Sequence, residues 1–328
     1  MRLQEMRSSS ALGPTYVLMT AAHNEEAFIE RTMMSVCSQT RLPQRWVIVS
    51  DNSNDRTDEI VETYVRKYNF IRFLRVTRTP GRTFASKVIA LQRAEKLLTD
   101  IAFDFIGNLD ADITVSPSYF EQLIDHCEQN PRLGIVSGFI WEEWAGEFQS
   151  RTANRVDSVP HAAQLVRRKC YEEIGGYTAL KNGGEDWYAQ TCAKIKGWRV
   201  ESVPSLHVFH HRHTGASTSL LSDRFRLGKL DYSLGSAPLF ELLKCIQRLP
   251  ETPFFMGGVA RFAGFIWSYL CAEERPVPEE FIAFLRSEQK LRVRSLFRKG
   301  HPTNTQVVRS DSSAPGSMPS GEQRDQAV

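Results

Sequence analysis

The sequence lacks the features that mark several classes of protein. Its 6 cysteines are scattered, with no C-x-x-C pair and no zinc-ligand spacing, so we expect reduced thiols rather than disulfides or a zinc ribbon. The opening stretch MRLQEMRSSSALGPT has no apolar run of the roughly 7 to 15 residues that a signal peptide needs, which predicts a cytoplasmic protein. The formal net charge of only +3 argues against nucleic acid as a partner.

Long hydrophobic runs are also missing. The most apolar window, residues 254–271, is shorter than the ~20 residues that span a bilayer and has Arg261 near its middle. We therefore predict no transmembrane helix. The remaining composition, 41% hydrophobic and 24% charged residues in a chain of 328, is that of an ordinary globular protein with one large domain or two medium ones.

What the sequence does contain, between residues 15 and 203, is an alternation of short β-rich runs with amphipathic stretches, typical of an α/β protein with a mostly parallel sheet. The polar and aromatic segment 141–163 has no clear period, so we predict a long loop or irregular insertion there. The expected strands are 16–20, 45–50, 71–76, 103–109, 133–138 and 198–203, and the expected helices are 26–38, 57–68, 84–98, 117–129 and 185–196.

Changes in composition divide the chain into four parts. We expect a flexible leader at 1–13, an α/β domain at 14–218, a helical C-terminal region at 219–300 and a disordered tail at 301–328. The tail is rich in Ser, Pro, Gly and Gln and has no aromatic residue, so it cannot bury enough apolar surface to fold.

Polar and acidic residues follow three of the expected strands. In an open α/β sheet, ligands bind beyond the carboxyl ends of the strands, which is where Asn24, Glu25, Asp51, Asp110 and Asp112 fall. None of these segments is a glycine-rich phosphate loop, which argues against a P-loop and against a Rossmann dinucleotide site. The sequence therefore predicts a polar crevice of another kind.

Asp110 and Asp112 are the candidate ligands of a hard cation. In extended chain, residues i and i+2 point to the same side, so both carboxylates can face Mg²⁺ or Mn²⁺. An acidic turn is the competing interpretation of this motif. Asp51 comes too early to cap the helix expected at 57, for which Asp55 is suited, so we expect Asp51 to face a ligand, for example by accepting a base N–H.

Glu185 and Asp186 stand side by side at a glycine-rich helix start. The helix dipole explains one acidic residue there, and the second could act as general base for an acceptor hydroxyl. Half of the 8 histidines fall close together, at 207, 210, 211 and 213. They indicate either a polar surface loop or a loop that folds over the site and supplies a third metal ligand or a diphosphate contact. His211 is the candidate metal ligand, although the spacing does not separate it from the other three.

Together these motifs resemble those of family 2 glycosyltransferases with the GT-A fold. The resemblance covers about residues 15–218. Two departures are the replacement of the family's proline and tyrosine or valine by Ala22 and His23, and a stretch at 80–87 that follows the family pattern only loosely. The motifs, in family order, are Asn24-Glu25-Glu26, 49–57, 108–112, Ile174-Gly175-Gly176-Tyr177, Gly184-Glu185-Asp186, Gly197-Trp198 and the histidine loop.

The resemblance implies an inverting enzyme that moves a sugar from a nucleotide-sugar donor to a carbohydrate or lipid-linked acceptor and uses Mg²⁺ or Mn²⁺. The Q-x-x-R-W signature of processive members is absent, which favours addition of single sugars in polysaccharide or glycolipid assembly. The alternative is a catalytically silent component of a polysaccharide-assembly complex that binds a nucleotide sugar or a glycan. A nucleotidyltransferase is disfavoured because its glycine-rich loop is missing.

The same resemblance implies roles for the candidate residues. Asn24, Glu25, Asp51 and Asp110 would bind the donor, with Asp51 at the base and Asp110 near the ribose or sugar. Asp112 would hold the metal together with Asp110. Asp186 would be the catalytic base, with Glu185 as the second choice.

The C-terminal region carries a prediction of its own. The segment after residue 222 resembles C-terminal regions of bacterial polysaccharide-assembly transferases. The basic and apolar stretch 286–300 suits an anionic lipid surface, and 254–271 could lie in the same interface at the inner face of the membrane. Packing helices of a soluble domain are the competing interpretation.

Overall fold

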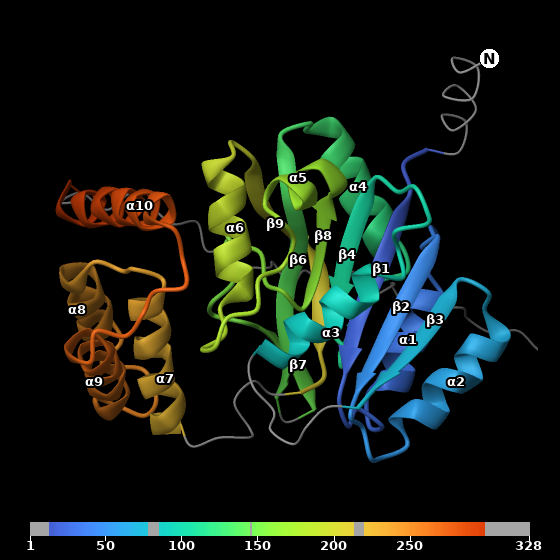
Figure 1. The fold of residues 1–328 in the computed structure, drawn as a ribbon, viewed down its shortest axis with the longest axis horizontal. Coiled ribbons are helices and arrows are strands. Elements are labelled where there is room, and N and C mark those ends of the chain that lie inside the picture. The colour runs from blue at the N-terminus through green and yellow to red at the C-terminus, as the bar shows by residue number, and fades with distance from the viewer. Residues whose placement is uncertain (1–12, 78–84, 145, 213–219, 299–328) are drawn as a thin grey trace, which may run out of the picture.

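A computed structural model describes residues 13–77, 85–144, 146–212 and 220–298 (Figure 1). The predictions for residues 1–12, 80–84, His213 and the tail lie outside these residues. The strands of the described part are β1 (Tyr16–Ala22), β2 (Arg45–Asp51), β3 (Ile71–Val76), β4 (Phe105–Leu109), β5 (Ile113–Val115), β6 (Leu133–Trp144), β7 (Glu147–Ser150), β8 (Ala163–Arg167) and β9 (Arg199–His210). The helices are α1 (Ile29–Cys37), α2 (Thr57–Lys67), α3 (Ala85–Glu95), α4 (Tyr119–Gln129), α5 (Arg168–Glu173), α6 (Glu185–Ile195), α7 (Leu220–Ser233), α8 (Pro238–Gln247), α9 (Met256–Leu270) and α10 (Glu279–Arg298).

The strands form one sheet in the order β3-β2-β1-β4-β8-β6-β9-β5, with β7 paired to β6. β3, β2, β1 and β4 run parallel to one another, and so do β6 and β9, whereas β8 runs antiparallel to β4 and β6. The predicted α/β class with C-terminal helices is confirmed. Because β1, β2 and β4 are parallel neighbours, their carboxyl ends meet at one edge of the sheet.

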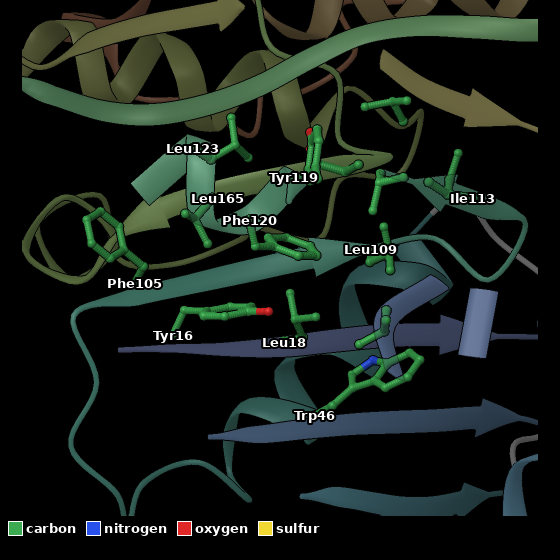
Figure 2. Close-up of a cluster of buried hydrophobic side chains, with 14 of the residues drawn as sticks. Tyr16, Leu18, Trp46, Phe105, Leu109, Ile113, Tyr119, Phe120, Leu123 and Leu165 are labelled. Atoms are coloured by element: carbon green, nitrogen blue, oxygen red, sulfur yellow. The ribbon is translucent and has the colours of Figure 1, made fainter. Parts of the chain in front are cut away.

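The central strands are almost continuously apolar because helices cover both faces of the sheet. Alternate residues of β1 enter two cores. Tyr16 and Leu18 face the side that α1 and α4 cover, where the ring of Tyr16 stacks on Phe120 with centroids 5.0 Å apart (Figure 2). Val17 and Met19 face the side that α3 covers. This two-sided packing fixes the strand register and with it the residues that reach the carboxyl edge.

The prediction of a loop or irregular insertion at 141–163 was wrong for 141–144 and 147–150, which form strands, whereas 151–162 are irregular apart from one isolated bridge. β6 continues to Trp144, the chain turns back as β7, and β8 begins at Ala163. The side-chain amide of Asn154 anchors the return by donating to the carbonyl of Ile140 at 2.8 Å and accepting from its N–H at 3.0 Å. β7 is largely exposed and lacks the apolar alternation by which a half-buried strand is recognised, which explains the error.

The C-terminal helices pack on the rest of the molecule through α6. Leu230, Phe281 and Leu285 share a core with Leu180, and Trp187 of α6 packs against it. In Figure 1, α7 to α10 stand beside α6, at the far end of the sheet from α2.

Two glycines let α7 and α9 approach each other closely. A Cβ on Gly228 would lie 1.8 Å from the carbonyl oxygen of Arg261, and one on Gly264 would lie 2.0 Å from that of Phe225. Among the described residues, no helix is long and apolar enough to cross a membrane.

Candidate active site

A pocket opens where β1, β2 and β4 end. Four of the predicted site residues line it: Glu25, Asp51, Asp110 and Asp112. The other lining residues are Ala21, Ala22, His23, Ser86, Lys87, Ala111 and Arg212. The structure therefore brings together the acidic residues that follow three different strands.

The loops after β1 and β2 are tied to each other at the rim of this pocket. Asn24 has a positive φ of 54°, and its Oδ1 accepts from the N–H of Asn54 at 2.9 Å. Asn24 is exposed and is not among the lining residues, so its observed contacts join the two loops. Asp51 is only 7% exposed at the end of β2, and its carbonyl oxygen lies 2.6 Å from Nδ1 of His23.

Asp110 forms a close ion pair with Lys87, which lies in the first turn of α3. The Lys87 ammonium lies 2.6 Å from Oδ1 and 2.8 Å from Oδ2 of Asp110. Burial works against the charge of Lys87, but Asp110, Glu185 and Asp186 together raise its pKa. Lys87 therefore remains a cation, held by Asp110 just after β4 and by the two carboxylates at the start of α6.

Asp112 faces two cations from the end of β9 and the residues just after it. Nε2 of His210 lies 3.3 Å from its Oδ2, and Nε of Arg212 lies 3.5 Å from the same oxygen. Burial opposes ionisation of Asp112, yet these partners hold its pKa below the ordinary value. Burial likewise opposes the charge of His210, but Asp112 and Glu142 raise its pKa to about 9. Arg212 also pairs with Glu25.

His210, and not the predicted His211, faces Asp112. Nε2 of His211 lies 2.8 Å from the hydroxyl of Thr114, and its Nδ1 lies 3.4 Å from Arg31. Burial and the charge of Arg31 lower the pKa of His211. β9 ends at His210, which lies beside Asp112, and His211 lies just beyond the strand and contacts Thr114 and Arg31 instead.

Glu185 and Asp186 begin α6 and have different surroundings. Oε1 of Glu185 lies 3.2 Å from Nδ1 of the buried His161, and although burial opposes ionisation, His161 and Lys87 lower the pKa of Glu185 to about 2. Burial raises the pKa of Asp186, and the neighbouring charge of Glu185 raises it further. Asp186 Oδ1 accepts from the N–H of Trp187 at 2.7 Å. Asp186 is thus the more basic carboxylate of the two.

A family model described as "Glycosyl transferase family 2" matches residues 18–184, about half of the chain. The chain belongs to this family. The matched range includes Glu25, Asp51, Asp110 and Asp112 and ends just before α6.

Curated relatives of this family 2 glycosyltransferase are similar to it over part of its length. It is 27% identical over 120 residues to the poly-β-1,6-N-acetyl-D-glucosamine synthase of Staphylococcus epidermidis, and this alignment covers 37% of this chain and 27% of the relative. It is 35% identical over 185 residues to the probable glycosyltransferase YdaM of Bacillus subtilis, and this alignment covers 50% of this chain and 43% of the relative. The matches therefore span less than half the length of these relatives.

Two solved structures share its fold. The mannosyltransferase PcManGT from Pyrobaculum calidifontis, in complex with GDP-Man and Mn²⁺, matches with a TM-score of 0.52 at 16% identity, covering 88% of this chain and 83% of that one. GalNAc-T7 with UDP, GalNAc and Mn²⁺ matches with a TM-score of 0.50 at 17% identity, covering 82% and 59%. The predicted GT-A type of the fold is confirmed.

The oxygen ligands that this pocket offers suit a hard divalent cation. Asp110 and Asp112 offer carboxylate oxygens in one pocket, the ligand type that Mg²⁺ and Mn²⁺ prefer. Within the described ranges, no group of three or more acidic, His or Cys side chains could hold a metal alone. A cation held by Asp110 and Asp112 would therefore need further ligands, such as substrate phosphates or water, because His211 does not complete a three-ligand group.

Sequence reasoning did not single out Lys87, Arg212 or His161. Lys87 is the last residue of a stretch that matches the family pattern only loosely. Arg212 lies between histidines that were the more obvious candidates for a metal or diphosphate contact. His161 lay in the segment expected to be a loop. A lone cation near acidic motifs is a weak signal, because its partners come from distant parts of the chain.

Proposed function

We propose that this chain is an inverting glycosyltransferase that moves a single sugar from a nucleoside-diphosphate sugar to a hydroxyl of a carbohydrate or lipid-linked acceptor, in polysaccharide or glycolipid assembly. The observation that carries the proposal is the gathering of carboxylates and cations in one pocket at the ends of β1, β2 and β4. The similarity to a poly-β-1,6-N-acetyl-D-glucosamine synthase supports polysaccharide assembly as its context.

The donor would lie along this pocket. Asp51 would accept hydrogen bonds from the base, and Asn24 and Glu25 would support the loop around it. Lys87, His210 and Arg212, now paired with acidic residues, would turn toward the diphosphate and offset its charge. Bound Mg²⁺ or Mn²⁺, the latter present in the two similar structures, would supply Lewis-acid stabilisation of the same charge, and Asp112 with Asp110 would hold it.

The transfer would be a single displacement with Asp186 as general base. The acceptor oxygen attacks the anomeric carbon while its proton passes to the Asp186 carboxylate. The bond from the anomeric carbon to the diphosphate breaks, and its electron pair leaves with the nucleoside diphosphate. Asp186 suits this role because burial and Glu185 make it more basic than an ordinary aspartate. His161 holds Glu185 as a stable anion, so Glu185 is the weaker candidate.

We also propose that the enzyme docks on the inner face of a membrane through α8 and α9. The one charged residue of α9, Arg261, is buried, and its Nε donates to Asp231 at 2.9 Å and to Glu241 at 3.1 Å. Most outward residues of both helices are apolar, with Gln247 as a polar exception, a pattern suited to the apolar boundary of a lipid surface. The exposed large apolar residues are Leu239, Leu242, Ile246, Met256, Val259, Trp267, Tyr269 and Leu270, with Phe254 and Phe255 between the helices.

Helix α10 contributes less to this face than the sequence suggested. Its Phe281, Ile282 and Leu285 are buried in the core shared with α7, Arg286 donates to the carbonyl of Gly235, and Arg292 lies 3.8 Å from Asp157. The described part of α10 is therefore mostly a packing helix.

Release of nucleoside diphosphate from a panel of nucleotide sugars tests the catalytic proposal. We expect turnover of at least one donor with Mg²⁺ or Mn²⁺, and loss of that turnover in excess chelator. Tight binding of a nucleotide sugar without turnover of any donor, in the presence of metal and acceptor glycans, would favour a silent binding component instead.

A further inference from the structure

A second cavity, outside the pocket just described, lies between the β6–β7 hairpin and α7. Its volume is about 710 Å³, within the range of roughly 300 to 1,000 Å³ that small-molecule sites occupy. One wall is lined by Glu142, Trp144 and residues 149–153, the other by Leu220, Asp223, Arg224, Arg226 and Leu227, and Arg248 and Glu251 close one end. We call this cavity the hairpin groove.

The hairpin groove adjoins the proposed catalytic site through one side chain. Glu142 lines the groove, and its Oε1 lies 3.9 Å from Nδ1 of His210. The other ring nitrogen of His210 lies 3.3 Å from Asp112 in the donor pocket. A molecule in the groove would therefore lie one residue away from the groups that face the donor.

The charges that line the groove are closely balanced. Four arginines and three acidic residues contribute to it. They stand in loose pairs: Arg151 Nε lies 3.5 Å from Glu142, Arg226 Nε 3.6 Å from Asp223, and Arg224 Nη1 3.3 Å from Glu251. A site for an anion needs an excess of cations, and a site for a lipid tail needs an apolar lining. This groove has an excess of only one arginine, and its apolar side chains are interrupted by charged pairs that offer both donors and acceptors.

An aromatic side chain completes the lining. Trp144, at the end of β6, is 57% exposed and faces the groove together with Gln149 and Ser150 of β7. An exposed indole beside paired carboxylates and guanidinium groups matches a sugar ring, whose C–H face stacks on an aromatic ring while its vicinal hydroxyls both donate and accept hydrogen bonds.

We propose that the hairpin groove binds uncharged sugar units of the acceptor glycan, next to the hydroxyl that receives the new sugar. This inference rests on the proposed function, because it assigns the acceptor side of the same reaction. It predicts that the enzyme recognises a neutral carbohydrate through Trp144 and through the charged pairs of α7.

The test uses the full chain and two variants that alter opposite walls of the groove. Trp144→Ala removes the stacking surface, and Asp223→Asn removes one charged acceptor with little change of shape. Trp267→Ala is the matched control, since Trp267 is 56% exposed but lies on α9, away from the groove. The probes are neutral β-1,6- and β-1,4-linked N-acetylglucosamine oligosaccharides and, for comparison, uronic-acid oligosaccharides, measured by ligand-observed NMR. Release of nucleoside diphosphate is measured in parallel.

We expect neutral oligosaccharides to bind, and Trp144→Ala to weaken this binding about tenfold, the effect of losing ~1.4 kcal/mol of stacking and burial. Asp223→Asn should weaken it as well, whereas Trp267→Ala should not. Donor hydrolysis without acceptor should stay unchanged in all three variants. The proposal is overturned if both groove variants bind neutral oligosaccharides like the wild type, if only acidic oligosaccharides bind, or if none binds while donor turnover proceeds. If neutral oligosaccharides bind, the two groove variants weaken that binding, and no donor is turned over, the assignment of the groove as a sugar site stands and the proposed transferase activity is refuted.

Discussion

Replacing Asp186 by Asn and Glu185 by Gln should have opposite effects on activity and stability. Both changes remove a carboxylate charge from the start of α6 and keep the shape of the side chain. They differ because His161 stabilises the charge of Glu185, whereas burial and Glu185 itself disfavour the charge of Asp186. One pair of variants can therefore separate the catalytic carboxylate from the structural one.

The Asp186→Asn variant should lose turnover and keep its fold. General-base catalysis contributes about 10²- to 10⁴-fold, or about 3 to 5 kcal/mol of barrier. The asparagine Oδ1 can still accept the N–H of Trp187, and the variant no longer carries a charge that burial disfavours. We therefore expect its free energy of unfolding at pH 7 to be no lower than that of the wild type. Donor affinity should change little.

The Glu185→Gln variant should lose stability. The folded pKa of about 2 against an ordinary value of 4.5 corresponds to about 3 kcal/mol at 1.36 kcal/mol per pKa unit. Since the folded pKa is lowered, this stability is present above about pH 4.5 and is lost as the pH falls through the folded value. Wild type and variant should thus differ most near neutral pH and converge in strong acid.

Denaturant unfolding between pH 2 and 8 and steady-state release of nucleoside diphosphate measure the two quantities. In the wild type, the raised pKa of Asp186 should make turnover fall on the acid side at a pH above 3.8, the ordinary value for aspartate. Wild-type turnover in Asp186→Asn, together with lost turnover and full stability in Glu185→Gln, would show that Glu185 is the base and that the reasoning from their surroundings is wrong.

Three further perturbations test other parts of the proposals. Asp112→Ala should abolish most metal-dependent turnover because it removes one of two carboxylate ligands; unchanged activity in chelator, with no metal found in the protein, would contradict this. Asp51→Ala should weaken nucleoside-diphosphate binding by about 1.5 to 3 kcal/mol. If calorimetric titration finds the affinity unaltered, Asp51 is a turn residue that does not contact the donor. Trp267→Glu should reduce flotation with anionic liposomes relative to wild type, with Met34→Glu, the same kind of change at an exposed apolar residue of α1, as the control. Wild-type protein that stays folded but does not float, or that forms dimers which Trp267→Glu dissociates, would assign the apolar face to another occupant.

Much of the fold could be predicted because the central strands and helices carry their burial in their sequence. The run from Trp46 to Val49 is fully buried between two helical layers and is recognisable as a strand from its apolar continuity alone. The β6–β7 hairpin could not be predicted in this way, since β7 is exposed and is held by pairing with β6 and by Asn154. Strands that depend on a partner rather than on a core leave little trace in the local pattern.

The site divides along the same line. Asp51, Asp110 and Asp112 could be found because each follows a buried strand, and the topology of a parallel sheet brings strand ends together. The partners of those residues could not be found. Lys87 reaches Asp110 from α3, and His210 lies beside Asp112 because β9 extends as far as His210, which was not expected. Local sequence identifies the acidic groups, and only tertiary structure identifies the cations that set their pKa values.

Helix α9 shows why an amphipathic pattern does not say which side of a helix faces inward. By composition alone, Arg261 would be placed toward solvent and the apolar residues toward a core. The reverse holds, because Asp231 of α7 and Glu241 of α8 supply buried carboxylates for the guanidinium. Removing one partner of such a buried ion pair strongly destabilises a protein, so the pair fixes the helix with Arg261 and Phe265 inward and most of its other large apolar residues outward. Large exposed apolar patches mark interaction sites, which is the physical reason to test α8 and α9 for binding to a membrane surface.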